Sequence, residues 1–207
     1  EITAPTIILG TGGYSNVPNV PGLQESGFLT SESLFGDKFP KQPYKSLAVL
    51  GAGPIGVEFA HVFDSAGTKV TILQHNVRLV PKEDADISEH LLNNYRERGI
   101  NVLLNQDTVE IRQKDGLKVV VTKDRTTGEI TETKVEEILV AAGIRPAVEE
   151  LHLENTGIET RPKGWIKTNE FLETSVDGIY ALGDVNGEPA FRHRANYEAD
   201  IIAHNLF

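Results

Sequence analysis

Apolar runs alternate with segments of helical periodicity in the middle of the chain. The run "KSLAVL" (Lys45–Leu50) is almost continuously apolar, which is typical of a parallel strand covered on both faces. The apolar residues that follow recur at intervals of three and four, which predicts one buried helix face: Ile55, Phe59, Val62, Phe63 and Ala66. Gly67 then predicts the helix end, and "KVTIL" (Lys69–Leu73) predicts the next strand.

A second helix is predicted further on. Asp86 and Glu89 have the spacing of a capping box, with Asp86 as the N-cap. The expected buried stripe and end of this helix consist of Ile87, Leu91, Tyr95 and the terminating Gly99. A strand at Ile100–Leu104 follows, so strands and helices alternate as they do in an open parallel sheet.

The pattern then changes to β-prone stretches separated by reversals. Asp115-Gly116 and Thr127-Gly128 mark two turns, which predicts a three-stranded antiparallel meander. A buried strand and a glycine turn follow in "EEILVAAG" (136–143). The predicted fold class is α/β: a Rossmann-like parallel sheet with helices on both faces and the meander inserted into it.

The two ends of the chain predict smaller elements. Thr6–Leu9 suggests a buried strand that runs into a glycine turn, and "GWIKT" (164–168) suggests a short strand. "GIYALGD" suggests a strand that leads into Gly183-Asp184, and an amphipathic helix is expected from Ala190 to Asn205. The expected domain boundaries are residues 1–40, 41–150 and 151–207, with the alternating strands and helices in the middle domain.

Composition narrows the possible functions. A formal net charge of −10 argues against nucleic acid or an anionic membrane as partner. The absence of cysteine excludes disulfides, thiol nucleophiles and cysteine-ligated metals within these 207 residues, and the six histidines have no metal-binding spacing. No metal is therefore expected. No secretory signal is visible at the start of the sequence, and we expect a cytoplasmic protein.

The candidate chemistry is concentrated in "GAGPIG", a Gly-x-Gly-x-x-Gly motif between a strand and a helix. This context favours dinucleotide binding over a glycine-rich turn without a ligand. Gly51 permits the sharp turn, Gly53 admits a pyrophosphate close to the backbone, and Gly56 allows helix and strand to pack. The helix N-terminus, which starts at Pro54, offers amide groups and a partial positive charge to the phosphates.

The end of the second strand bears on the choice of dinucleotide. A carboxylate there holds the ribose of NAD, whereas a cation holds the extra phosphate of NADP. Gln74 and His75 stand in that place, with Arg78 nearby in sequence. Gln74 can bond a ribose hydroxyl, and His75 is a weak phosphate clamp. The absence of an adjacent arginine favours NAD slightly, and both cofactors stay open.

Four further stretches occur in an order that resembles the pyridine nucleotide–disulfide oxidoreductases, flavoenzymes that include dihydrolipoamide dehydrogenase and mercuric reductase. They are "TIILGTGGYSNVPNVPG", "GAGPIGVEFA", "ILVAAGIRP" and "TSVDGIYALGDV". The resemblance covers essentially the whole chain. It implies that NAD or NADP binds here and that FAD is a cofactor of the full-length parent, which would be a homodimer.

Individual site residues are also implied by the resemblance. Asp184 matches the residue that binds the ribityl chain of FAD, although it could equally cap the following helix. Thr11 and Gly12 match the turn that lines the flavin, where Gly10 and Gly13 depart from the usual Ala and Ser. Three further matches complete the set. Gly143 matches the second glycine turn, Ile55 the residue over the flavin, and Glu58 the residue that meets the carboxamide. Glu58 also suits the first helical turn electrostatically.

The family's N-terminal FAD motif, its redox-active cysteines and its C-terminal interface domain have no counterpart here. We therefore expect a fragment, inactive alone, of an enzyme that moves hydride between nicotinamide and flavin and then to a disulfide or dithiol. The flanking segments would form a small incomplete layer or pair between chains. Two alternatives stay open: a complete enzyme whose single fingerprint holds FAD, and a non-catalytic nucleotide-binding redox sensor or interaction module.

Overall fold

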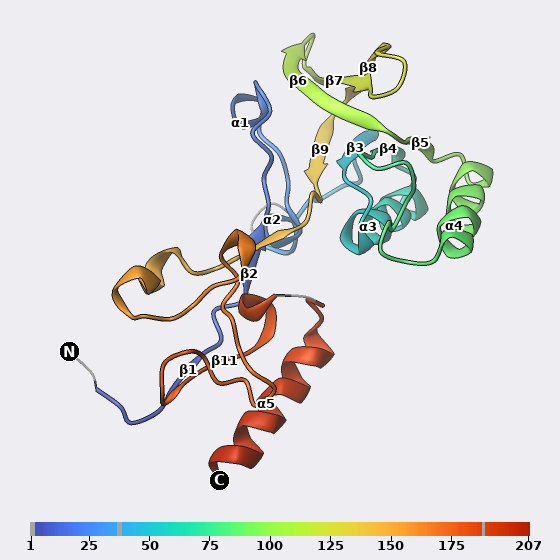
Figure 1. Cartoon of the computed structure of the whole chain (residues 1–207). Coiled ribbons are helices and arrows are strands. Elements are labelled where there is room, and N and C mark those ends of the chain that lie inside the picture. Colours follow the sequence, from blue (N-terminus) through green and yellow to red (C-terminus); the bar gives the residue numbers. More distant parts are fainter. Residues whose placement is uncertain (1–2, 37–38, 188) are drawn as a thin grey trace. The chain divides into compact units, whose positions relative to one another are not determined.

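The computed structural model describes residues 3–36, 39–187 and 189–207 (Figure 1). The chain divides into two units, which we call the central unit (Ser15–Gly143) and the terminal unit (Glu1–Tyr14 with Ile144–Phe207). The domain boundaries that we expect from the sequence, at residues 40 and 150, separate functional regions and stay a prediction. None of the helices in the described ranges is long and apolar enough to cross a membrane.

A four-stranded parallel sheet forms the middle of the central unit, in the order β5-β4-β3-β9. Its strands are β3 (Ser46–Leu50), β4 (Lys69–Leu73), β5 (Asn101–Leu103) and β9 (Glu137–Val140). Val49 of β3 pairs with Ile72 on one side and Leu139 on the other. This sheet, with its helices and meander, confirms the predicted α/β fold class.

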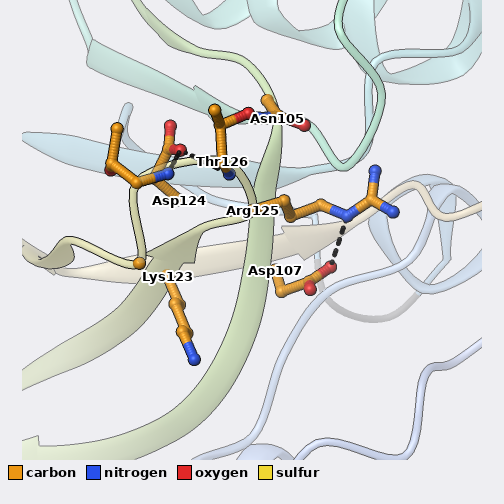
Figure 2. Close-up of a pocket in the computed structure, with 8 residues that line it drawn as sticks. Asn105, Asp107, Lys123, Asp124, Arg125 and Thr126 are labelled. Atoms are coloured by element: carbon orange, nitrogen blue, oxygen red, sulfur yellow. Dashed lines mark hydrogen bonds and ion pairs between the residues drawn. The ribbon is translucent and has the colours of Figure 1, made fainter.

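The antiparallel meander is also confirmed. It consists of β6 (Gln106–Lys114), β7 (Leu117–Asp124) and β8 (Ile130–Val135). Asp115 and Gly116 form the first turn with positive φ angles of 54° and 77°. At the second turn, the carboxylate of Asp124 accepts hydrogen bonds from the amides of Thr126 and Thr127, both at 2.8 Å (Figure 2). These bonds lower the pKa of Asp124, because they stabilise its carboxylate in the charged form.

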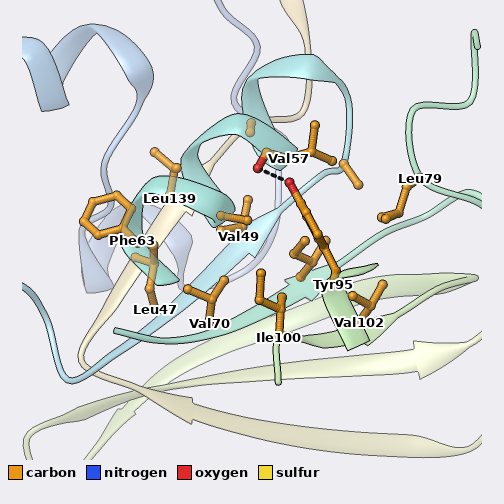
Figure 3. Close-up of a cluster of buried hydrophobic side chains, with 14 of the residues drawn as sticks. Leu47, Val49, Val57, Phe63, Val70, Leu79, Tyr95, Ile100, Val102 and Leu139 are labelled. Atoms are coloured by element: carbon orange, nitrogen blue, oxygen red, sulfur yellow. Dashed lines mark hydrogen bonds between the residues drawn. The ribbon is translucent and has the colours of Figure 1, made fainter. Parts of the chain in front are cut away.

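The two faces of the sheet are covered differently, because alternate residues of each strand point to opposite sides. On one face, side chains such as Val49 and Val70 pack against helices α3 (Pro54–Ser65) and α4 (Ala85–Glu97), as Figure 3 shows. On the other face, side chains such as Leu50 and Ile138 pack against the meander and Leu23 of the short helix α1 (Leu23–Ser26).

The helix interiors differ from the predicted stripes. In α3, Val62 is exposed, and the buried positions are Gly56, Val57, Ala60 and Phe63. In α4, Ile87 is exposed, and the buried residues are Ser88 and Tyr95. Apolar spacing identified both helices correctly. Phe63 and Tyr95 are buried as predicted, and Ile55, Phe59 and Leu91 are partly buried against the same core.

The predicted capping box of α4 is wrong. The N-cap is Asp84, whose side chain makes no capping hydrogen bond. The helix starts at Ala85, so Asp86 already lies inside the first turn, and its carboxylate accepts from the neighbouring Ile87 amide at 2.9 Å. The predicted ends are confirmed, since Gly67 and Gly99 follow α3 and α4 with φ of 88° each.

In the terminal unit, β1 (Ile7–Leu9) pairs in parallel with β11 (Ile179–Ala181), so the two flanking segments form one small layer. The expected burial of β1 is wrong: Ile7 and Ile8 are each almost half exposed, because only two strands make this sheet. The expected strand at 164–168 is also wrong, since Ile166 makes only an isolated bridge with Thr160. The small core of the terminal unit contains Ile158, Ile166, Ala181 and Val185.

The remaining elements are short, apart from the last helix. They are β2 (Gly13–Ser15), which pairs with β10 (Ile144–Pro146), and α2 (Ser31–Phe35). Four 3₁₀ turns lie at Glu149–Leu151, Leu153–Asn155, Pro162–Gly164 and Gly183–Asn186, the last of them η4. Helix α5 (Arg192–Leu206) closes the chain, within two residues of its predicted limits.

Candidate nucleotide-binding site

The turn between β3 and α3 is shaped by two glycines that packing requires. Gly51 has φ of 103°, and a Cβ placed on it would lie 2.5 Å from the carbonyl oxygen of Ala141. A Cβ on Gly56 would lie 2.2 Å from the carbonyl oxygen of Gly51. Both distances are below any real Cβ contact. A side chain at either position would therefore force the strand and helix apart.

Gly53 is different, because no protein atom lies within 4 Å of the place where its Cβ would be. Its backbone is also ordinary, with φ of −73° and ψ of −176°, which any residue adopts. Neither packing nor conformation within the chain therefore requires glycine here. The open space next to the Gly53 backbone is what close approach of a ligand would need.

The N-terminus of α3 begins at this open position. The first bond within the helix runs from the Val57 amide to the Gly53 carbonyl at 3.1 Å, so the amides before Val57 have no partner inside the helix. Gly53 has no side chain to cap them, and Pro54 has no amide proton. Such a helix end carries a partial positive charge and binds anions well.

The Gln74 side chain is hydrogen-bonded to the glycine turn. Its side chain is buried, its Oε1 accepts from the Ala52 amide at 3.1 Å, and its Nε2 donates to the Arg78 carbonyl at 3.1 Å. The side chain therefore ties the glycine turn to the segment after β4, a role that the sequence did not indicate. Its expected bond to a ribose hydroxyl stays a prediction.

His75 is the first exposed side chain after β4, and it meets a carboxylate that the sequence analysis missed. Its Nδ1 lies 2.7 Å from Oδ1 of Asp107. Figure 2 shows the other contact of the same oxygen, which lies 3.6 Å from Nε of Arg125. Asp107 stands 32 residues further along the chain, at the start of β6. Only the folded register brings it there, so no local motif could have found it.

Ile55 and Glu58 lie on the first turns of α3. Ile55 is partly buried against the core, and Glu58 is exposed. Beside them, the Tyr95 hydroxyl donates to the Val57 carbonyl at 2.7 Å and ties α4 to α3 (Figure 3). Burial raises the pKa of Tyr95, and the Glu58 carboxylate raises that pKa as well, so the hydroxyl remains a proton donor.

Thr11, Gly12 and Asp184, which match the flavin site, lie in the terminal unit, whereas Gly143, which matches the second glycine turn, lies in the central unit. In the terminal unit, Gly12 has φ of 74°, and a Cβ on Gly13 would lie 3.7 Å from Cβ of Asp184, so the turn that contains Thr11 lies near Asp184. In the central unit, Gly143 has φ of 94° with open space around it.

The capping alternative for Asp184 is wrong. Asp184 lies within η4, and Phe191 is the N-cap of α5. Glu198, which the sequence analysis did not single out, holds this turn. It is buried, accepts from the Gly183 amide at 2.6 Å, and pairs with Arg194 at 2.8 Å. The Arg194–Glu198 spacing of four residues was a visible signal.

No group of three or more possible metal ligands occurs among the residues that the structure describes.

The geometry is that of an α/β unit with a glycine turn at the N-terminus of α3, and comparison with known proteins identifies its family. The chain belongs to the pyridine nucleotide-disulphide oxidoreductase family, whose pattern matches residues 1–199. It is 35% identical over 205 residues to a mercuric reductase of Staphylococcus aureus, covering 99% of this chain and 37% of that protein. It is 36% identical over 203 residues to a dihydrolipoyl dehydrogenase of Acholeplasma laidlawii, covering 96% and 56%.

Solved structures agree. The HOCl-induced flavoprotein disulfide reductase RclA of Escherichia coli matches with a TM-score of 0.87 and 32% identity over 98% of this chain and 45% of that one. An engineered water-forming NADPH oxidase matches with a TM-score of 0.83, over 97% and 46%, but only 21% identity, and so supports the fold alone. The chain thus spans about a third to a little over half of these relatives.

Proposed function

We propose that residues 41–150 bind NAD or NADP and that the chain is the nucleotide-binding part of an FAD-dependent oxidoreductase. The observation that carries this proposal is the open space at Gly53 beside unpaired amides of α3. The pyrophosphate would lie against those amides, within the turn formed by Gly51, Gly53 and Gly56. Ile55 and Glu58, on the following turn of α3, would lie toward the nicotinamide end.

Residues 1–40 and 151–207 would contribute to an FAD domain. Thr11 and Gly12 would line the flavin, and Asp184, which has no capping role, would accept a hydrogen bond from its ribityl chain. Gly143 would let the backbone of the second glycine turn come close to a bound cofactor. When bound, the flavin supplies the hydride acceptor, while the protein binds and orients the reactants.

The whole enzyme would pass electrons from NAD(P)H through flavin to a disulfide, or in reverse. The names of the relatives support this class, since they include mercuric reductase and dihydrolipoyl dehydrogenase. This chain contains no cysteine, so the thiol chemistry would require other parts of the parent, and the chain alone would be inactive. The parent would be a cytoplasmic homodimer.

Titration of the purified chain with NADH and with NADPH, monitored by calorimetry, tests the proposal. We expect saturable binding of at least one nucleotide, and a colourless protein because the flavin site would be incomplete. Gly53→Ser is the matched variant: serine is a favoured N-cap residue and fits the Gly53 backbone, so the fold should persist while its side chain obstructs the pyrophosphate. Absence of binding to the wild-type chain, or equal binding by Gly53→Ser, would contradict the proposal.

A further inference from the structure

The adenosine end of the proposed site contains a carboxylate from an unexpected element. Gln74 follows β4 directly, but its amide is buried between Ala52 and Arg78. A carboxylate close to the end of β4 is that of Asp107, whose Oδ1 lies 2.7 Å from Nδ1 of the exposed His75 ring. In nucleotide-binding folds of this type, the group beside the ribose at the end of the second strand decides between NAD and NADP.

The backbone holds Asp107 in this place. The Gln74 carbonyl accepts from the Gln106 amide at 2.9 Å, and the Asn76 carbonyl accepts from the Asn105 amide at 3.0 Å. These bonds continue the β4–β5 pairing past the ends of the strands and set residues 74–76 against residues 105–106. Asp107 therefore lies beside His75 by register rather than by the choice of a flexible side chain.

Two arginines of this region, Arg125 and Arg78, are already engaged, and Lys123 lies opposite Asp107 in the register of β6 and β7. Nε of Arg125 lies 3.6 Å from the Asp107 carboxylate (Figure 2). Nη1 of Arg125 donates to the His75 carbonyl at 3.4 Å. The Arg78 guanidinium donates to the Pro81 carbonyl at 3.0 Å. A ribose 2′-phosphate beside His75 would meet the Asp107 charge, whereas a 2′-hydroxyl could donate to that carboxylate.

We infer that Asp107 makes the site select NAD(H) over NADP(H), an inference that rests on the proposed nucleotide function. The selectivity comes from the meander instead of from the residue at the end of β4. A carboxylate that repels the 2′-phosphate acts through partly exposed charge, so the preference should weaken as salt concentration rises.

The test compares dissociation constants of NADH and NADPH for the full chain and three variants. We expect the wild-type chain to bind NADH at least tenfold more tightly. Asp107→Asn should reduce that ratio at least fivefold, mainly through tighter NADPH binding, and Asp107→Glu should retain most of it. Asp115→Asn is the matched control, because it removes the same charge from the turn that follows the far end of β6, about 25 Å away.

The outcomes distinguish failure of the proposed nucleotide binding from failure of the inference about Asp107. If the wild-type chain binds neither nucleotide, the proposed function fails and this inference fails with it. If it binds both but Asp107→Asn leaves the ratio unchanged, or if the wild-type chain prefers NADPH, only the inference is overturned. Asp107 is half-exposed, and circular dichroism of each variant verifies that a changed ratio does not reflect a changed fold.

Discussion

Gly53 and Gly56 lie three residues apart in one motif, yet different constraints act on them. At Gly56 the constraint is internal, because a Cβ would overlap the carbonyl of Gly51. At Gly53 the chain itself leaves the space open. Stability and ligand binding should therefore respond separately to substitution at these two positions.

We expect Gly56→Ala to lower the free energy of unfolding by about 1–3 kcal/mol, because overpacking outweighs the better helix propensity of alanine. Gly53→Ser should leave it unchanged within about 0.5 kcal/mol or raise it slightly, since serine is a good N-cap. Urea unfolding of both variants measures the difference. Equal destabilisation by the two substitutions would contradict the distinction.

We expect the Tyr95 hydroxyl to make the free energy of unfolding depend on pH. Burial raises its pKa in the folded chain above the ordinary value of about 10. Its contribution is therefore fully present below pH 10 and is lost as pH rises through the higher folded pKa. We expect Tyr95→Phe to cost about 1 kcal/mol at pH 7 and to show a shallower stability loss than wild type above pH 10. Parallel pH profiles by urea unfolding would exclude this role.

Among the elements, periodicity was sufficient to predict the sheet, both long helices of the central unit and the meander. It failed where an element's partners are distant in sequence. Nothing local shows that β1 pairs with β11, more than 160 residues further on. For the same reason the glycine turn was visible in the sequence, while Asp107 beside His75 was not. The start of α4 failed for another reason, because Asp84 and Asp86 are both plausible N-cap residues and the structure uses Asp84.

A shielded ion pair ties the meander to the sheet. Lys118 of β7 pairs with Glu137 of β9 and donates to the Gly27 carbonyl at 2.9 Å, and both side chains are largely buried. Because water screens this pair poorly, removal of one charge leaves the other uncompensated.

We expect Glu137→Gln to destabilise the chain by about 2 kcal/mol, and the double variant Lys118→Met with Glu137→Leu to recover most of that loss. Glu159→Gln is the control, since the Lys167–Glu159 pair is about 60% exposed and should contribute less than about 1 kcal/mol. A double-mutant cycle from urea midpoints measures the coupling. If Glu137→Gln costs no more than Glu159→Gln, the pair does not hold the meander to the sheet.

At the scale of the whole molecule, the two units differ in how much apolar core they have. The central unit has two large clusters on the two faces of its sheet, whereas the buried cluster of the terminal unit, among the residues that the structure describes, consists of Ile158, Ile166, Ala181 and Val185. Since burial of apolar surface supplies most of the stability, the terminal unit should unfold first. The single tryptophan, Trp165, lies in that unit and reports on it alone.

Urea unfolding followed by Trp165 emission should therefore have a lower midpoint than unfolding followed by far-ultraviolet circular dichroism, which the larger central unit dominates. ADP-ribose, the dinucleotide without its nicotinamide, offers a selective ligand for the proposed site. At a hundred times its dissociation constant it should stabilise the central unit by about 2.7 kcal/mol and leave the Trp165 transition in place. Transitions that coincide and move together would instead mean that the two units unfold as one cooperative structure, with the nucleotide stabilising both.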